Sequence, residues 1–125
     1  MSTRIMIVDD SLVVRQQLKS VLRGAGFATL EAVDGVDALK QIETEENLNL
    51  IVLDLNMPNM NGLEFLEALR KIPAHKSLPV VMLTTEAHPK LLQQAKQLGA
   101  IGWIVKPFKA ETIIAVATRV GTKAA

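Results

Sequence analysis

Short apolar runs alternate with stretches of helical periodicity along the whole chain. Runs rich in Ile, Val and Leu indicate buried β-strands, because the strands of a parallel sheet are covered on both faces. The candidate strand at residues 28–32 is less apolar than the others and is therefore expected at a sheet edge. The predicted strands cover residues 5–8, 28–32, 50–53, 79–83 and 101–105.

A helix is predicted after each strand, because apolar residues there recur every three or four positions. Ser11, or Asp10 before it, can cap the first helix, and Gly24 and Gly26 can end it. Pro89 suits the first turn of the fourth helix. The apolar stripes are Val14, Leu18, Val21 and Leu22; Val36, Leu39 and Ile42, within about 35–45; Leu63, Leu66 and Leu69; Leu91, Leu92, Ala95 and Leu98; and Ile113, Ile114, Val116 and Ala117.

Five strand–helix units in series predict an α/β fold, a single doubly wound (βα)5 domain whose parallel sheet has helices on both faces. The 125 residues are the length of one domain. No linker or internal repeat marks a second one. We therefore expect one domain over residues 1–125, with its core at about 4–120 and an unstructured tail at 121–125.

Composition narrows the class of protein. Lys and Arg number 14 and Asp and Glu 13, and the formal net charge of +1 provides no general attraction to nucleic acid or anionic lipid. The absence of cysteine excludes disulfides and thiolate-bound metal sites. The apolar run at residues 5–8 is too short for a signal peptide or a membrane helix. We expect a cytoplasmic monomer that binds neither DNA nor membranes.

Chemically capable residues follow four of the strands. They are Asp9 and Asp10 after the first, Asp54 after the third, Thr84 after the fourth and Lys106 after the fifth. In open α/β sheets, ligands bind beyond the carboxyl ends of the strands. Adjacent strands lie about 4.8 Å apart, so three carboxylates meet here if the first and third strands are neighbours.

Such a cluster of carboxylates repels itself unless a cation compensates it. Mg²⁺ fits, because it accepts one or two carboxylates together with water and phosphate oxygens, and Mn²⁺ could replace it. Lys106 would balance the remaining charge. A cation site, a carboxylate nucleophile, a hydroxyl and an ammonium together suit phosphoryl transfer onto a carboxylate.

The same residues carry a resemblance to a known family. The motifs, in chain order, are Asp9-Asp10; Asp54 with Met57-Pro58 and Gly62; Thr84; and Lys106-Pro107-Phe108. Over about residues 4–120 the chain resembles the receiver domains of two-component response regulators. The resemblance implies a flavodoxin-like, CheY-like sheet with strand order 2-1-3-4-5. Because the chain ends with the fifth helix, we expect a stand-alone receiver without a DNA-binding domain.

The resemblance also implies roles at the acidic cluster. Asp54 would be the phosphoryl acceptor. Asp10, Asp54 and the backbone carbonyl of Asn56 would bind Mg²⁺ directly, and Asp9 would bind it mostly through water. These roles are expectations carried over from the family onto the matching positions.

Other positions would respond to the phosphoryl group. Lys106 would pair with it, and Thr84 would move its hydroxyl onto a phosphoryl oxygen. Trp103 occupies the aromatic switch position, where Tyr or Phe is commoner; Trp is bulkier and offers only a donor, so an inward rotamer needs more room. Pro107 and Gly62 would be structural, and the bond before Pro107 is usually cis in the family.

Three positions beside the site are implied to tune dephosphorylation: Asn56, Thr85 and Glu86. Thr85 is larger than the Gly or Ala often found there, so we expect it to narrow access for the phosphoryl donor. The stretches 84–86 and 102–107 resemble those of chemotaxis regulators.

The predicted function is therefore that of a phosphorylation-activated response regulator rather than an enzyme. A histidine kinase or a histidine phosphotransfer domain would supply the phosphoryl group. The face formed by the fourth helix, fifth strand and fifth helix would contact a downstream protein, with the flagellar motor switch as one candidate. Chemotaxis is the expected process, and a phosphorelay step or a phosphate sink is the alternative. A haloacid-dehalogenase-like phosphohydrolase would need an acid where Asn56 stands.

Each assignment has a purely structural alternative. Asp9 and Asp10 could be charges favoured at a helix N-terminus. Thr84 could be a β-branched strand residue, and Trp103 a packed aromatic. Leu12 and Val13 lie off the apolar stripe of the first helix and could either dock a helical partner or extend the core.

Overall fold

The computed structural model describes residues 3–45, 47–85 and 88–124, with side chains described up to residue 120. Within this part of the chain, five parallel strands form one sheet in the order β2-β1-β3-β4-β5. The expected order is confirmed, and the less apolar β2 lies at an edge as predicted. The strands are β1 (Arg4–Val8), β2 (Ala28–Ala32), β3 (Leu50–Asp54), β4 (Val80–Thr84) and β5 (Gly102–Val105).

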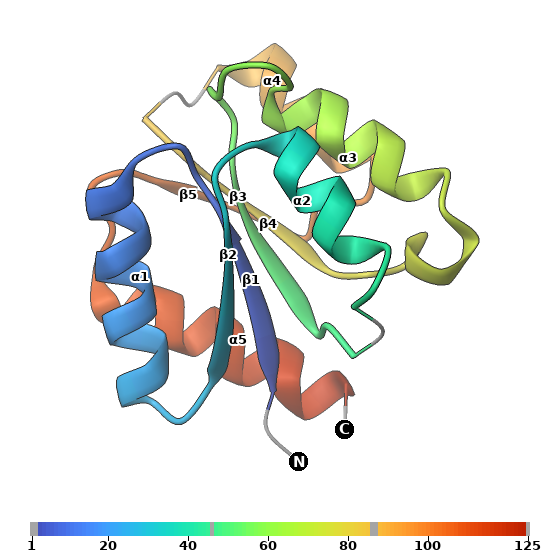
Figure 1. Ribbon diagram of the computed structural model, residues 1–125. Coiled ribbons are helices and arrows are strands. Elements are labelled where there is room, and N and C mark those ends of the chain that lie inside the picture. The colour runs from blue at the N-terminus through green and yellow to red at the C-terminus, as the bar shows by residue number, and fades with distance from the viewer. Residues whose placement is uncertain (1–2, 46, 86–87, 125) are drawn as a thin grey trace.

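Helices cover both faces of this sheet. They are α1 (Leu12–Gly24), α2 (Gly35–Ile42), α3 (Gly62–Arg70), α4 (Pro89–Gln97) and α5 (Ala110–Ala124), with a short 3-10 helix η1 (Pro73–His75) before β4. In Figure 1, α1 and α5 lie on one face of the sheet, and α2, α3 and α4 lie on the other. The doubly wound α/β prediction is confirmed. Among the described helices, none combines the length and the apolarity needed to cross a lipid bilayer.

Side-chain alternation along the strands builds one core on each face. Ile51 and Met82 pack in the core beneath α2, α3 and α4, whereas Val52 and Leu83 pack in the core beneath α1 and α5. Successive residues of a strand point to opposite faces, so a strand buried on both faces appears in the sequence as a continuous apolar run. Each fully buried side chain of this kind contributes about 1.5–3 kcal/mol.

Side-chain caps fix the helix starts beside the carboxyl ends of the strands. Ser11 caps α1 as predicted, and its hydroxyl accepts a hydrogen bond from the Val14 backbone N–H at 3.3 Å. Asn61 and Glu64 form a capping box at the start of α3. Each cap contributes about 1 kcal/mol and sets the residue at which the loop becomes helix.

The predictions for two helix ends are wrong. α5 continues to Ala124, so the tail expected to be unstructured at 121–125 is helical over residues 121–124. This tail contains no proline, and its lysine and alanine residues are favourable helix formers. α2 ends at Ile42 rather than near residue 45, because the backbone bonds that follow span three residues, as in a turn.

Candidate functional site

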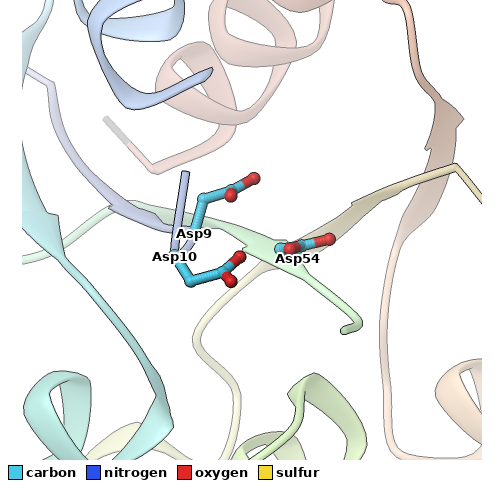
Figure 2. Close-up of side chains that lie close together, drawn as sticks. All are labelled: Asp9, Asp10 and Asp54. Atoms are coloured by element: carbon cyan, nitrogen blue, oxygen red, sulfur yellow. The ribbon is translucent and has the colours of Figure 1, made fainter. Parts of the chain in front are cut away.

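Three carboxylates gather at the carboxyl ends of β1 and β3. Asp9 and Asp10 directly follow β1, and Asp54 is the last residue of β3. One oxygen atom of each carboxylate lies within 4.8 Å of those of the other two. Figure 2 shows the three side chains, with the Asp10 carboxylate extended toward Asp54. Asp9 and Asp54 are buried, whereas Asp10 is exposed. The predicted meeting of these carboxylates is confirmed.

The register of the sheet explains why they meet. Val8 of β1 pairs with Leu53 of β3, so the residue that follows each of them comes level at the end of the sheet. Alternation then places Asp54 on the same face as Val52, toward α1 and α5. Asp9 shares this face, because it lies two residues after Ile7.

Lys106, the residue after β5, brings a cation to the cluster. Its Nζ lies 2.8 Å from Asp9 Oδ2 and 3.4 Å from Asp54 Oδ1. Its side chain is only 15% exposed, so water screens these contacts weakly. The Lys106 backbone N–H donates to the Thr84 carbonyl at 2.8 Å, which ties the end of β5 to the end of β4. Within the cluster, one ammonium faces three carboxylates, and negative charge stays uncompensated.

The pKa values of two groups reflect this imbalance. Burial, and then the Asp9 carboxylate, raise the pKa of Asp54 to about 6 against the opposing effect of Lys106. Burial alone lowers the pKa of Lys106, but its contacts with Asp9 and Asp54 outweigh burial and leave that pKa above its ordinary value. Lys106 is therefore charged at neutral pH. A carboxyl with a strongly raised pKa beside a specific charged partner indicates a functional site.

Asp9 is held rigidly by its neighbours. Its backbone N–H donates to the Ala32 carbonyl at 3.2 Å, and its Oδ1 accepts from the Ser11 N–H at 2.9 Å. Its own carbonyl accepts from Arg15 Nη1 at 2.7 Å. Arg15, a buried charged residue of α1, is not among the residues predicted from the sequence. The available signal was its place on the buried stripe, three residues before Leu18.

The predicted switch and tuning residues occupy different places around the cluster. Thr84 ends β4 and is fully buried, and Thr85 after it is exposed. Asn56 is exposed two residues after Asp54. Glu86 lies outside the described residues. Their roles stay predictions.

Trp103 of β5 is half-buried and packs against the core beneath α4. Together with Leu92 and Ala95 of α4, it lines an open groove of about 500 Å³. The packed-aromatic interpretation is confirmed, and the switch role stays a prediction.

Gly62 and Pro107 occupy structurally demanding positions. The Gly62 N–H donates to the Leu55 carbonyl at 2.8 Å, and a Cβ at Gly62 would collide with the Asp54 carbonyl oxygen. Only glycine allows the loop to return so closely to β3. The Lys106–Pro107 peptide bond is cis, as the resemblance implied.

Two apolar residues lie exposed at the start of α1, directly after its cap Ser11. Leu12 is 57% exposed and Val13 61%. They therefore do not extend the core. Docking of a helical partner on them stays a prediction.

The donor set of the cluster fits a hard divalent cation. Its carboxylate oxygens come from the ends of two strands, and one oxygen of each group lies within 4.8 Å of the others, as the ligands of one ion require. The raised pKa of Asp54 shows that its negative charge lacks full compensation. Mg²⁺ relieves such an imbalance, because it accepts carboxylate and carbonyl oxygens and retains bound water.

Comparisons with known proteins agree with this geometry. Residues 5–118 match the family described as the response regulator receiver domain. The chain is 41% identical over 111 residues to chemotaxis protein CheY of Pseudomonas aeruginosa, covering 88% of this chain and 89% of that protein. It is equally identical over 111 residues to chemotaxis protein CheY-3 of Vibrio cholerae, covering 88% and 85%.

A solved structure shows the same likeness in three dimensions. Chemotaxis protein CheY4 of Vibrio cholerae superposes with a TM-score of 0.90 at 39% identity, covering 96% of this chain and 99% of that one. The family match, these relatives and the strand order agree, and the chain belongs to the family of response regulator receiver domains, in its CheY-like form.

Proposed function

We propose that this chain is a phosphorylation-activated switch whose phosphoryl acceptor is Asp54. The observation that carries the proposal is a buried carboxylate with two carboxylates beside it and the Lys106 ammonium 3.4 Å away, all at the carboxyl end of the sheet. A histidine kinase or a histidine phosphotransfer domain supplies the group from a phosphohistidine, in the cytoplasm.

The transfer is a displacement at phosphorus. A carboxylate oxygen of Asp54 forms the new O–P bond as the N–P bond of the phosphohistidine breaks, and the electron pair of that bond returns to the imidazole nitrogen. The attacking carboxylate carries no proton, so no base is needed at Asp54. Lys106 lies close enough to Asp54 Oδ1 to pair with an oxygen of the incoming group.

Mg²⁺ would be held by Asp10, Asp54 and the backbone carbonyl of Asn56. When bound, it supplies positive charge to the oxygens of the transferred group. Asp9 would not bind the ion directly, because its two carboxylate oxygens already accept hydrogen bonds from the Ser11 N–H at 2.9 Å and from Lys106 at 2.8 Å. Contact of Asp9 with the ion through water is consistent with these bonds.

The phosphorylated state differs mainly in charge. A phosphoryl group brings a charge of roughly −2 at neutral pH, which attracts the Lys106 ammonium and the Thr84 hydroxyl. Lys106 follows β5, Thr84 ends β4, and the bond from the Lys106 N–H to the Thr84 carbonyl links them. Their movement reshapes the surface formed by α4, β5 and α5. A target protein that binds the new shape more tightly shifts the conformational equilibrium toward it.

Chemotaxis is the proposed process, because the relatives named above are chemotaxis proteins at 41% identity. The proposed output is protein–protein contact, with a component of the flagellar motor switch as the candidate target. We further propose that Asn56, Thr85 and Glu86 set the lifetime of the phosphoryl group. Mn²⁺ should support the same reaction as Mg²⁺, since it accepts the same oxygen ligands.

Mass spectrometry of the intact chain tests the proposal. Acetyl phosphate with Mg²⁺ should add one phosphoryl group, which peptide mapping places on Asp54. Asp54→Asn should abolish the addition, whereas Glu67→Gln, which changes an exposed carboxylate of α3, should leave it intact. Labelling that survives in Asp54→Asn, or that proceeds equally in EDTA, would contradict the proposed site.

A further inference from the structure

The loop between β3 and α3 contains a strained turn. Asn59 has a φ of 67°, in the left-handed region that a non-glycine residue rarely adopts. The Met60 N–H donates to the Pro58 carbonyl at 2.7 Å. A hydrogen bond across three residues with a positive φ at the centre is the rare and strained form of the γ-turn. Such a turn persists where the surrounding structure holds it in place.

Asp34, at the N-cap of α2, holds the centre of this turn. Asn59 Nδ2 donates to Asp34 Oδ2 at 2.8 Å, and the Asp37 N–H donates to Asp34 Oδ1 at 2.8 Å. Asp34 is buried, and these two bonds keep its pKa below the ordinary value despite burial. Both carboxylate oxygens therefore accept a hydrogen bond, and bonds to a charged acceptor are stronger than bonds to a neutral one.

A packing contact reinforces this bond. A Cβ at Gly35 would lie 2.7 Å from Met60 Cγ, so the bare backbone of Gly35 lets Met60 pack directly on the first turn of α2. At its far end, the loop closes on its own first residue through the Gly62 N–H bond to the carbonyl of Leu55, directly after β3. The loop is thus fixed in the middle by α2 and at its end by this bond.

We infer that Asp34 and Asn59 are positioning residues that hold the β3–α3 loop in the shape required for cation binding and phosphoryl acceptance at Asp54. The inference rests on the proposed function, in which Asn56 of the same loop offers its backbone carbonyl to the cation. Asn56 lies three residues before Asn59, so relaxation of the turn changes the backbone path that carries this carbonyl. Asp34 and Asn59 act through the loop and touch no reacting atom.

The need for two acceptors separates this role from helix capping. Ser caps a helix about as well as Asp does, because one side-chain oxygen is sufficient. The single, shorter hydroxyl of Asp34→Ser can accept the Asp37 N–H but does not provide the second oxygen that Asn59 Nδ2 requires. Asn59→Gly tests the other partner, because glycine adopts a positive φ freely and yet cannot bond to Asp34.

Titration calorimetry with Mg²⁺ alone on the full chain measures the effect. Asp34→Ser and Asn59→Gly should each weaken Mg²⁺ binding about tenfold, as is usual when a residue that orients a metal ligand is changed. The double variant Asp34→Asn with Asn59→Asp exchanges donor and acceptor at constant net charge and should keep most of the wild-type affinity. Asp37→Asn is the matched control, because it removes one charge from the same helical turn without touching the loop.

Charge and stability effects are distinguished by two further readouts. Asn59→Asp alone should weaken Mg²⁺ binding, since it sets two carboxylates against each other, whereas simple attraction of the cation would strengthen it. Urea unfolding of each variant shows that binding is measured on folded protein. Lower urea midpoints with unchanged Mg²⁺ affinity would mean that the residues are merely structural and would overturn the inference.

The outcome also distinguishes this inference from the proposed function. A wild-type chain that binds no Mg²⁺ would overturn both. Binding by the wild type with equal affinity in Asp34→Ser, Asn59→Gly and Asp37→Asn would overturn the positioning role alone. Loss in the first two, retention in the third and recovery in the exchanged pair would support it.

Discussion

The Lys106 ammonium lies 2.8 Å from the Asp9 carboxylate, although 97 positions separate these residues in the chain. β1 and β5 are not neighbours in the sheet, so the lysine reaches past β4 and β3 to make this contact. Its distance to Asp54 Oδ1 is longer, at 3.4 Å. Asp9 therefore competes with Asp54 for the lysine, and a phosphoryl group on Asp54 would change the balance between the two contacts.

Replacement of Lys106 should destabilise the chain when no divalent cation is present. Lys106→Met leaves the buried Asp9 and Asp54 carboxylates without their cation, at an expected cost of about 2 kcal/mol in the free energy of unfolding. Urea unfolding in EDTA measures this cost, and added Mg²⁺ should reduce it. Lys71→Met, which removes an exposed pair with Glu67, should change stability by less than about 0.5 kcal/mol. Equal losses in both variants would contradict the role assigned to Lys106.

Asp54 should make the metal-free protein less stable as pH rises. The pKa of Asp54 is about 6 in the folded chain and near the ordinary value of 3.8 once unfolded. Between these values the folded state holds more protons than the unfolded state, so its stability falls with increasing pH. In EDTA at pH about 7, the free energy of unfolding of Asp54→Asn should exceed that of the wild type by about 1–2 kcal/mol. This difference should disappear below pH about 4. A constant difference in unfolding free energy between the two proteins over this pH range would contradict the raised pKa of Asp54.

Thr85 should restrict access to Asp54. Its exposed side chain follows the buried Thr84 at the carboxyl end of β4. Thr85→Ala removes the hydroxyl and a methyl group, so phosphorylation by acetyl phosphate should become several times faster. Stopped-flow or quenched labelling measures the rate, and Thr44→Ala, an exposed position after α2, serves as the control. Equal rates in wild type and Thr85→Ala would show that this side chain does not limit entry.

Trp103 should report the switch by fluorescence, because it is the single tryptophan of the chain. It pairs with Met82 in the sheet. Met82 lies two residues before Thr84 and therefore on the same face of β4. Acetyl phosphate with Mg²⁺ should change its emission in the wild type and leave it unchanged in Asp54→Asn. In Thr84→Ala the emission change should shrink although mass spectrometry still detects the phosphoryl group. A full change in Thr84→Ala would mean that Thr84 does not transmit the signal.

Gly62 should tolerate no side chain. In Gly62→Ala the new Cβ meets the Asp54 carbonyl oxygen, and the loop must move away from β3. The expected loss is about 2–3 kcal/mol of unfolding free energy, together with weaker Mg²⁺ binding. Gly24→Ala is the matched control, because nothing lies within 4 Å of a Cβ there and alanine favours the helix. A stable Gly62→Ala variant with normal Mg²⁺ binding would contradict the close approach.

Local signals were sufficient to predict the elements of this fold. Apolar runs and helical periodicity located the strands and helices. Asp54, Thr84 and Lys106 directly follow apolar runs, which put them at strand ends. These features are determined by neighbouring residues, whose side chains must all reach a core. The pairing of the first and third strands came from the family resemblance, because periodicity carries no information about which strands are adjacent. The prediction of an unstructured tail is wrong over residues 121–124, since a short segment of polar and small residues has no clear period.

By itself, the sequence determined that carboxylates and one lysine stand at the carboxyl ends of parallel strands, and their meeting followed once the resemblance made the first and third strands neighbours. Only the tertiary structure decided which groups hold them there. Arg15 bonds to the Asp9 carbonyl, and Asn59 bonds to Asp34 across 25 positions. The strength of such bonds depends on distances of a few tenths of an ångström and on the exclusion of water. Both quantities arise only when the helices pack on the sheet.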